Sequence, residues 1–251
     1  MKQVGFLRLV GTNGDVTFYR GRTGGFKAKS KSSLNKDRIK NDPNFVRTRE
    51  NNAAFTSAAN GARLLRSAVS ELSAEAKGNN LASRMLKVMS AIVRTDTTSP
   101  RASRNVAAGD ITLLENFAFN NKAPLDAVLK TLNTATISRT TGTLQLDVPA
   151  FVPEKALSIP TGATHYKIVS AGVEINFANH TVVVDQKASA FLPIDSVATA
   201  PLTQTNTVSA GSSAPLLLFA GVKFFQEVNG VKYSLKNVAN NPLGIIKVSV
   251  V

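Results

Sequence analysis

Residues 216–232 read LLLFAGVKFFQEVNGVK, and they carry the strongest fold signal in the chain. Leu216–Gln226 is a β-type run, and a second run begins at Val231. Between them lies the pair Asn229-Gly230, whose two residues tolerate the positive φ angles of a tight two-residue turn. The segment therefore predicts an antiparallel β-hairpin.

Similar β-type runs surround this hairpin and are separated by turn-forming residues. They are Leu144–Val148, Val173–Phe177, Val182–Val184, Phe191–Val197, Val231–Leu235 and Ile245–Val251. In the first two, apolar and polar residues alternate, as in strands with one buried face. Many short strands with turns between them predict an antiparallel β-sandwich or open barrel. We place this β domain at residues 136–251.

Residues 43–135 have a helical period and predict a helical middle region. Asp42-Pro43 suits a helix start, and Gly78-Asn79-Asn80 separates two apolar stripes that predict an antiparallel helical hairpin. Two shorter helices are expected over Ile111–Phe119 and from Pro124 to Leu132. The first stripe is Phe55, Ala58, Ala62, Leu65, Val69 and Leu72, and the second is Leu81, Met85, Val88, Met89 and Ile92, with both methionines as core residues.

Residues 1–42 have a third character, with short β-type runs broken by glycines. Strands are expected at Val4–Val10 and Val16–Arg20, joined by a turn at Gly11–Gly14, with a third strand at Phe26–Lys29. Residues 29–42 have no apolar face and predict a linker or basic arm. The fold class is therefore α+β, with an N-terminal hairpin and arm, a helical middle and a C-terminal β domain.

Positive charge is concentrated in the first part of the chain. The 251 residues include 30 Lys and Arg against 16 Asp and Glu, a net charge of +14, and residues 1–110 hold 20 of the bases and 8 of the acids. Such a field attracts nucleic acid, an anionic membrane face or an acidic patch on a neighbouring subunit, although a solvated loop explains it equally well. The predicted contact residues are Arg20, Arg22, Lys27, Lys29, Lys31, Lys36, Arg38, Lys40, Arg47 and Arg49.

Motifs for catalysis and cofactors are missing from the sequence. There is no cysteine, only His165 and His180 could serve as imidazole bases, and no phosphate-binding loop, GxGxxG, GxSxG or HExxH motif occurs. His165 is expected to be a hydrogen-bonded strand residue and His180 a turn residue. The acids Glu154, Glu174, Asp185 and Asp195 are scattered among strands. We therefore expect no enzyme activity, no cofactor and no metal site.

The sequence also bears on localisation. No apolar run approaches the ~20 residues of a membrane span, so none is expected. The N-terminal stretch carries Arg8 within its apolar part and lacks a small-residue cleavage site, which makes it a poor secretory signal. These features predict synthesis in the cytoplasm without a signal peptide, and leave open a final location in a particle or filament.

Several blocks resemble an uncharacterised Bacteroidetes-type protein family of about this length. These blocks are GDVTFYR at 14–20, NDPNFVRTREN at 41–51, NFAFN at 116–120, APL at 123–125, PTGATHY at 160–166 and VKFFQEVNGVKYSLKN at 222–237. The resemblance covers the whole architecture and implies no established activity and no catalytic residues. The N-terminal pattern also resembles, loosely, proteins found near phage-derived particle genes, which favours a structural component.

Two function classes follow from these observations. The first is a non-enzymatic, self-assembling structural subunit of a filament, tube or phage-like particle, whose copies are linked through the N-terminal arm. The alternative is a cytoplasmic nucleic-acid-binding protein that uses the basic N-terminal half, with Phe18, Tyr19 and Phe26 beside Arg20 and Arg22 as a stacking surface. The expected partners are accordingly copies of the chain itself or nucleic acid.

Overall fold

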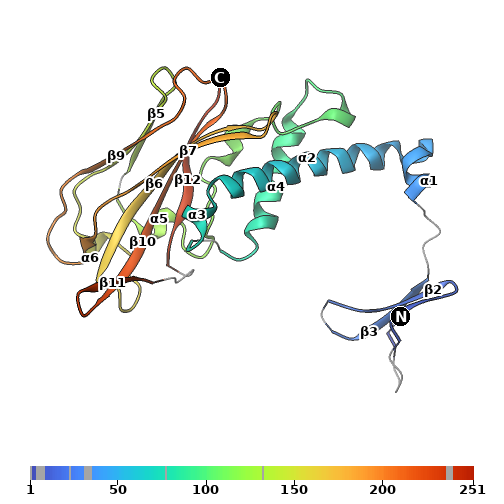
Figure 1. Cartoon of the computed structure of the whole chain (residues 1–251), viewed down its shortest axis with the longest axis horizontal. Coiled ribbons are helices and arrows are strands. Elements are labelled where there is room, and N and C mark those ends of the chain that lie inside the picture. Colours follow the sequence, from blue (N-terminus) through green and yellow to red (C-terminus); the bar gives the residue numbers. More distant parts are fainter. Residues whose placement is uncertain are drawn as a thin grey trace. The chain divides into compact units, whose positions relative to one another are not determined.

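The computed structural model describes residues 2–3, 9–22, 24–30, 36–76, 78–131, 133–235 and 240–251. The fold is mixed α+β with three antiparallel sheets (Figure 1), so the predicted class is confirmed at this level. Two compact units are present, Met1–Asn51 and Asn52–Val251. We call them the N-terminal unit and the large unit. The predicted region limits at 42/43 and 135/136 stay a prediction.

A six-stranded antiparallel sheet forms the centre of the large unit. Its main order is β11-β10-β6-β7, with β12 also paired to β10 and β8 to β6. The strands are β6 His165–Asn176, β7 Thr181–Ala188, β8 Leu192–Pro193, β10 Leu216–Val228, β11 Val231–Ser234 and β12 Leu243–Ser249.

Residues 216–222 of β10 are apolar without interruption because both faces of the strand are buried there. Leu218 and Phe224 point into a core shared with the second sheet, whereas Leu217 and Phe219 point into a core shared with the helices. The paired strand β6 alternates in the same way. Burial on both faces is what produces a continuous apolar run instead of simple alternation.

The hairpin that the sequence predicts most strongly is confirmed. Val228 pairs with Val231, and the two turn residues Asn229 and Gly230 have φ angles of 52° and 79°. Both angles are positive, as the two-residue turn that matches the strand twist requires.

A three-stranded sheet lies on one face of the large sheet, and the helices within residues 52–95 lie on the other (Figure 1). Its order is β4-β5-β9, with β4 Thr134–Ser138, β5 Thr143–Val148 and β9 Leu202–Thr207. In β5 the predicted alternation is confirmed, since Leu144, Leu146 and Val148 are all buried. The expected strand Phe191–Val197 is wrong in extent, because only Leu192–Pro193 pairs, with the first two residues of β6.

Side chains join the small sheet to both edges of the large one. Arg139 donates from Nη1 to the Ser212 carbonyl (2.6 Å) and from Nη2 to the Ser249 carbonyl (2.7 Å). On the opposite edge, Asn206 Nδ2 donates to the Asp185 carbonyl (2.9 Å) and the Thr207 amide donates to the Asp185 carboxylate (2.8 Å). These bonds link strands that are not neighbours in either ladder.

The helical core confirms most of both predicted stripes but not the predicted hairpin. Helices α2 Val46–Ala68, α3 Ser70–Ser73 and α4 Leu81–Thr95 contribute to it, and α4 crosses α2 steeply instead of running alongside it (Figure 1). Gly61 of α2 packs tightly against the loop after α4, because a Cβ on it would lie 3.0 Å from Val106 Cγ2. Met85 and Met89 are fully buried as core residues, but Phe55 is 57% exposed, so its assignment to the core is wrong.

The helices expected over 111–119 and 124–132 are much shorter than predicted. The first is the 3₁₀ turn η3 Ile111–Leu114 and the second is α5 Leu125–Val128. The reason is that residues 116–119 instead follow the edge of β12, with the Asn116 amide donating to Ile245 and the Phe119 amide to Leu243, both at 2.8 Å. Two further short helices are η2 Arg101–Ser103 and α6 Pro153–Ala156.

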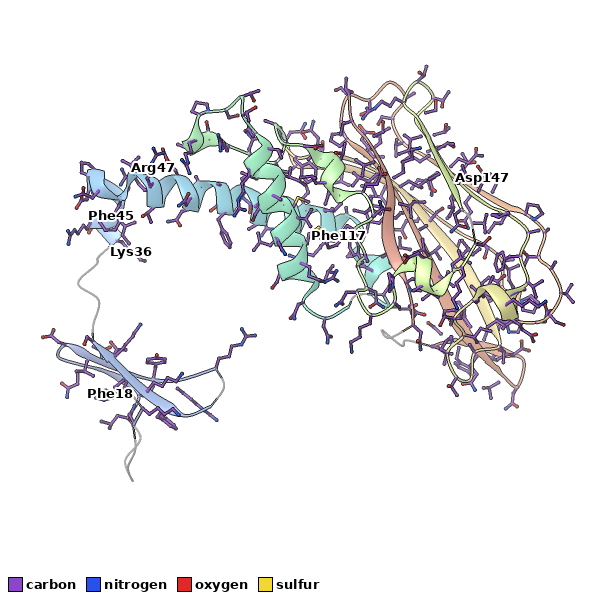
Figure 2. The ribbon with its side chains drawn as sticks, turned by 180° about the vertical axis from the view of Figure 1, so that it is seen from behind. Phe18, Lys36, Phe45, Arg47, Phe117 and Asp147 are labelled. Atoms are coloured by element: carbon purple, nitrogen blue, oxygen red, sulfur yellow. The ribbon has the colours of Figure 1, made fainter. Side chains whose placement is uncertain are left out.

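Arg84 of α4 fixes this extended segment against the helices. Its guanidinium donates to the Ala118 carbonyl (2.6 Å) and the Phe119 carbonyl (2.7 Å), and lies 5.4 Å from the Phe117 ring centroid. Phe117 lies between α4 and the large sheet (Figure 2). Phe117 and Phe119 are therefore core residues, but they lie in an extended segment and not in a helix.

Asp96, directly after α4, organises the loop that follows, and this gives a first testable expectation. Its fully buried carboxylate accepts bonds from the amides of Ser99, Asn105 and Thr98 and from the Thr98 hydroxyl. The Ser99 amide is the largest cause that holds the pKa of Asp96 well below its usual range. Because the folded pKa lies below the unfolded one, this stabilisation is present above about pH 4 and is lost as pH falls.

We therefore expect Asp96→Asn to lower the melting temperature at pH 7, since an amide cannot accept every bond that the carboxylate accepts. The difference from the parent should narrow as pH falls below about 4, in melts followed by circular dichroism. A difference that does not change with pH would contradict this role for the carboxylate.

Candidate functional site

The N-terminal unit has almost no core of its own. Among its described residues only Ala28 is buried, whereas Val10, Val16 and Val46 are apolar and exposed. Residues 1–51 hold 12 Lys and Arg against 4 Asp and Glu, a net charge of +8. This unit combines the predicted contact residues with the least internal packing, and it is the candidate functional region.

Its sheet has the order β1-β2-β3, with β1 Gly11–Asn13, β2 Val16–Arg20 and β3 Phe26–Ser30. The predicted turn at Gly11–Gly14 is wrong, because β1 begins at Gly11 and the turn is Gly14-Asp15. Gly14 has a φ of 56°, so the turn forms where glycine permits a positive φ. Of the strand expected at Val4–Val10, residues 4–8 lie outside the described residues, and Leu9 and Val10 are not in a strand.

The register of this sheet gives its two faces different chemistry. Directly opposite residues share a face, so the pair Phe18 and Ala28 lies on one side and the pairs Tyr19–Lys27 and Thr17–Lys29 lie on the other. The first face is largely apolar, with Val16 and Phe26 beside Phe18, which Figure 2 labels. The second face is polar and basic.

We call this second face the lysine face. Tyr19 is 38% exposed, and Lys29 Nζ lies 5.6 Å from its ring centroid. Lys2 forms an isolated antiparallel bridge with Lys27 and so joins the same face from the open edge of β3. The Thr12 and Thr17 hydroxyls lie 3.2 Å apart on it. The residues of the lysine face are Lys2, Thr12, Thr17, Tyr19, Lys27 and Lys29.

Residues 36–41 are helical, which corrects this part of the linker predicted at residues 29–42, and the helical start predicted at Asp42-Pro43 follows directly. Helix α1 spans Lys36–Asn41, 3₁₀ turn η1 spans Pro43–Phe45, and α2 follows directly. As predicted, Asp42 caps the start of η1, where its side chain accepts a hydrogen bond from the Asn44 amide (2.9 Å). That amide, followed by the Arg38 side chain, lowers the pKa of Asp42.

Three of the predicted contact residues support this helical segment locally. Arg38 pairs with Asp42 at 3.2 Å, Arg47 pairs with Glu50 at 2.8 Å, and Arg49 donates to the Ile39 and Asp42 carbonyls. Figure 2 shows Lys36, Phe45 and Arg47 around the junction of α1 and α2. The arginines here are partly committed to holding the junction together.

The ten predicted contact residues therefore fall into three places. Lys31 lies outside the described residues. Arg20, Arg22, Lys27 and Lys29 belong to the sheet and its turn, and Lys36, Arg38, Lys40, Arg47 and Arg49 belong to the α1–α2 segment. Within the described part of the chain, no carboxylate lies within ion-pair distance of Lys27 or Lys29. Sequence reasoning missed Lys2, which reaches the site only through its bridge to Lys27.

The histidines of the large unit have structural surroundings. His165 Nε2 lies 3.5 Å from Glu227, which also pairs with Lys232 at 3.0 Å, and His165 Nδ1 lies 3.0 Å from the Thr164 hydroxyl. His165 is thus a hydrogen-bonded strand residue, as predicted, although its partner Glu227 is far away in sequence. His180 has a φ of 59° in the turn between β6 and β7, where a turn residue was expected.

The acids Glu174 and Asp185 each contact other groups, and these contacts do not join the two as a catalytic pair. Glu174 accepts bonds from Ser212 and Ser209, and although burial opposes it, these bonds lower its pKa overall. Asp185 pairs with Lys187 at 3.3 Å. No group of three or more His, Cys, Asp or Glu side chains able to hold a metal occurs in the part of the chain that the structure describes.

The large unit also has an open cleft of about 630 Å³ between α5, β4 and β12. Its lining is mainly apolar, and Asp126 and Lys130 are its charged residues. The buried Asn133 Oδ1, on a lining residue, has no hydrogen-bond partner. Nothing in this lining resembles an acid–base or nucleophile pair.

Comparisons with protein families, curated proteins and solved structures found no match. The two resemblances drawn from the sequence therefore stay expectations. Among the described residues, no helix combines the length and apolar character needed to cross a membrane.

Proposed function

We propose that the protein is a non-enzymatic, self-assembling structural subunit of a filament, tube or phage-like particle. In this proposal the N-terminal hairpin and basic arm link each copy to the next. The single observation that carries it is the contrast between the units. The large unit holds both hydrophobic cores, whose buried residues begin at Ala58, whereas Ala28 is the only buried residue described in the N-terminal unit.

A small sheet with so little internal packing gains stability when a partner covers its apolar face. Phe18 and Val16 belong to that face, and the exposed Leu9 and Val10 precede the sheet. A second copy of the chain is the partner that a structural subunit always has at hand, and exchange of terminal segments is a common way to build repeating contacts.

The large unit offers a surface that complements a basic, partly apolar segment. The Glu154 amide donates to the Asp195 carbonyl, which brings helix α6 beside the loop after β8. Among the described residues, neither Glu154 nor Asp195 has a Lys or Arg within ion-pair distance, and the nearby Val197 is 69% exposed. We propose this acidic patch, Glu154 and Asp195, as the acceptor on the neighbouring copy.

The proposal predicts regular particles from the purified full-length chain at about 50 mM salt, seen by negative-stain microscopy and by light scattering. Raising the salt to about 500 mM should reduce particle mass, because screening weakens ion pairs at the subunit contact. Glu154→Gln with Asp195→Asn should reproduce that loss at low salt, and a matched control pair is Asp126→Asn with Asp110→Asn. A chain that stays a dispersed monomer in all of these conditions would contradict the proposal.

A further inference from the structure

We infer that the lysine face of the N-terminal unit binds single-stranded nucleic acid, with Tyr19 as a stacking platform for a base and Lys2, Lys27 and Lys29 as phosphate contacts. This site lies on the opposite side of the sheet from the apolar face, so it does not depend on self-assembly. The inference rests on three features of the described residues, which are the register, the exposed ring and the unpaired charge.

The register places three cations beside the ring, all on the side where β3 pairs with β2. Tyr19 lies directly opposite Lys27, and Lys2 is bridged to Lys27 one strand further out. Lys29 comes two residues after Lys27 on β3, and so it lies on the same face, about 6.5–7 Å further along the strand. Its Nζ is 5.6 Å from the Tyr19 ring centroid. An aromatic ring with ammonium groups next to it is an arrangement by which proteins hold a base and its adjacent phosphates together.

The charge of this face is not neutralised within the sheet. Asp15 is the only acidic residue between positions 1 and 36, and it lies in the turn between β1 and β2. No carboxylate of the described residues is within ion-pair distance of Lys2, Lys27 or Lys29. Unpaired lysines attract a polyanion by displacing its condensed counterions, which favours nucleic acid over a neutral partner.

The ring favours a single strand over a duplex. Tyr19 is 38% exposed on the face of the sheet, and a ring in this position can stack only on a base whose face is open. In a duplex the base faces are covered by their neighbours. The hydroxyls of Thr12 and Thr17 lie on the same face and can donate to phosphate or sugar oxygens.

The test is fluorescence anisotropy with the full-length chain and a labelled oligo-dT of about 15 nucleotides, a length that fits one small binding domain. We expect Tyr19→Leu to weaken binding about tenfold, and Tyr19→Phe to bind like the parent because stacking is kept. The double variant Lys27→Gln with Lys29→Gln should lower the slope of log K against log salt by about 1.4, the value for two phosphate contacts on a single strand.

The charge-matched control is Lys130→Gln with Lys155→Gln in the large unit, where both side chains are exposed. It should leave oligo-dT affinity unchanged, and circular dichroism should show all variants folded. Equal binding by the parent and Tyr19→Leu would overturn the inference, as would duplex DNA binding as tightly as oligo-dT. Binding of heparin or an acidic peptide with no binding of oligo-dT would also overturn it, in favour of a protein or polysaccharide partner.

Discussion

Replacing Phe219 by alanine is expected to lower the free energy of unfolding by about 3–5 kcal/mol, the usual cost of removing a large buried aromatic side chain. Phe219 is fully buried on β10, where it faces the helical core, and its ring meets Phe119 edge to face with centroids 5.6 Å apart. The variant would leave a cavity between the large sheet and the extended segment 116–119, which pairs with the edge of β12. Urea unfolding followed by circular dichroism measures the loss.

Phe55→Ala is the matched control, because it removes the same atoms from a side chain that is 57% exposed. Its effect should stay within about 0.5 kcal/mol, as for most surface substitutions. Comparing the two variants also tests the sequence prediction against the structure, since the apolar stripe places Phe55 in the core. Equal losses at both positions would show that the helical core is not as described.

Deleting residues 1–42 is expected to leave a folded remainder that no longer assembles. Both hydrophobic cores and both sheets of the large unit lie beyond the cut, so their packing is retained. The remainder loses the basic sheet and α1, together with the Asp42 cap of η1, the turn that leads into α2, and this loss costs about 1 kcal/mol. We expect cooperative unfolding close to that of the parent, measured by thermal melts, with light scattering reporting monomers.

A remainder that fails to fold would show that the N-terminal unit belongs to the core of the large one. The matched control is the full-length chain with Glu154→Gln and Asp195→Asn, which keeps every residue of the N-terminal unit. If that chain also stops assembling while it stays folded, donor and acceptor have both been identified.

The elements that sequence predicts well are those with strong local patterns. The hairpin at Asn229-Gly230 is fixed by φ requirements that few residues meet, and the stripe around Met85 and Met89 is fixed by helical spacing. Strand β4, TATIS, and strand β9, LTQTNT, carry few apolar residues and were missed, because their pairing depends on β5 between them.

Where long-range contacts decide the conformation, the sequence pattern misleads. Phe117 and Phe119 have apolar neighbours compatible with a helix, but the edge of β12 accepts their segment as an extended chain. Phe55 continues the apolar stripe in the sequence, but its side chain is exposed and lies outside the core.

The same holds for the candidate site. Composition identifies the basic segment, yet it does not show that Lys27, Lys29 and Tyr19 share a face, because that follows from the register of β2 on β3. Lys2 joins them only by its bridge across β3. The arginines at 38, 47 and 49 look alike in sequence but prove to be engaged in local pairs and carbonyl contacts. Charge density thus predicts the region that holds the candidate site, and the strand register determines which of its residues share a face.

Negative-stain microscopy of the full-length chain and of the chain lacking residues 1–42, at equal concentration and low salt, decides whether the N-terminal unit links copies of the chain. We expect regular particles from the first and dispersed, folded monomers from the second. Particles of the same form from the truncated chain would contradict it.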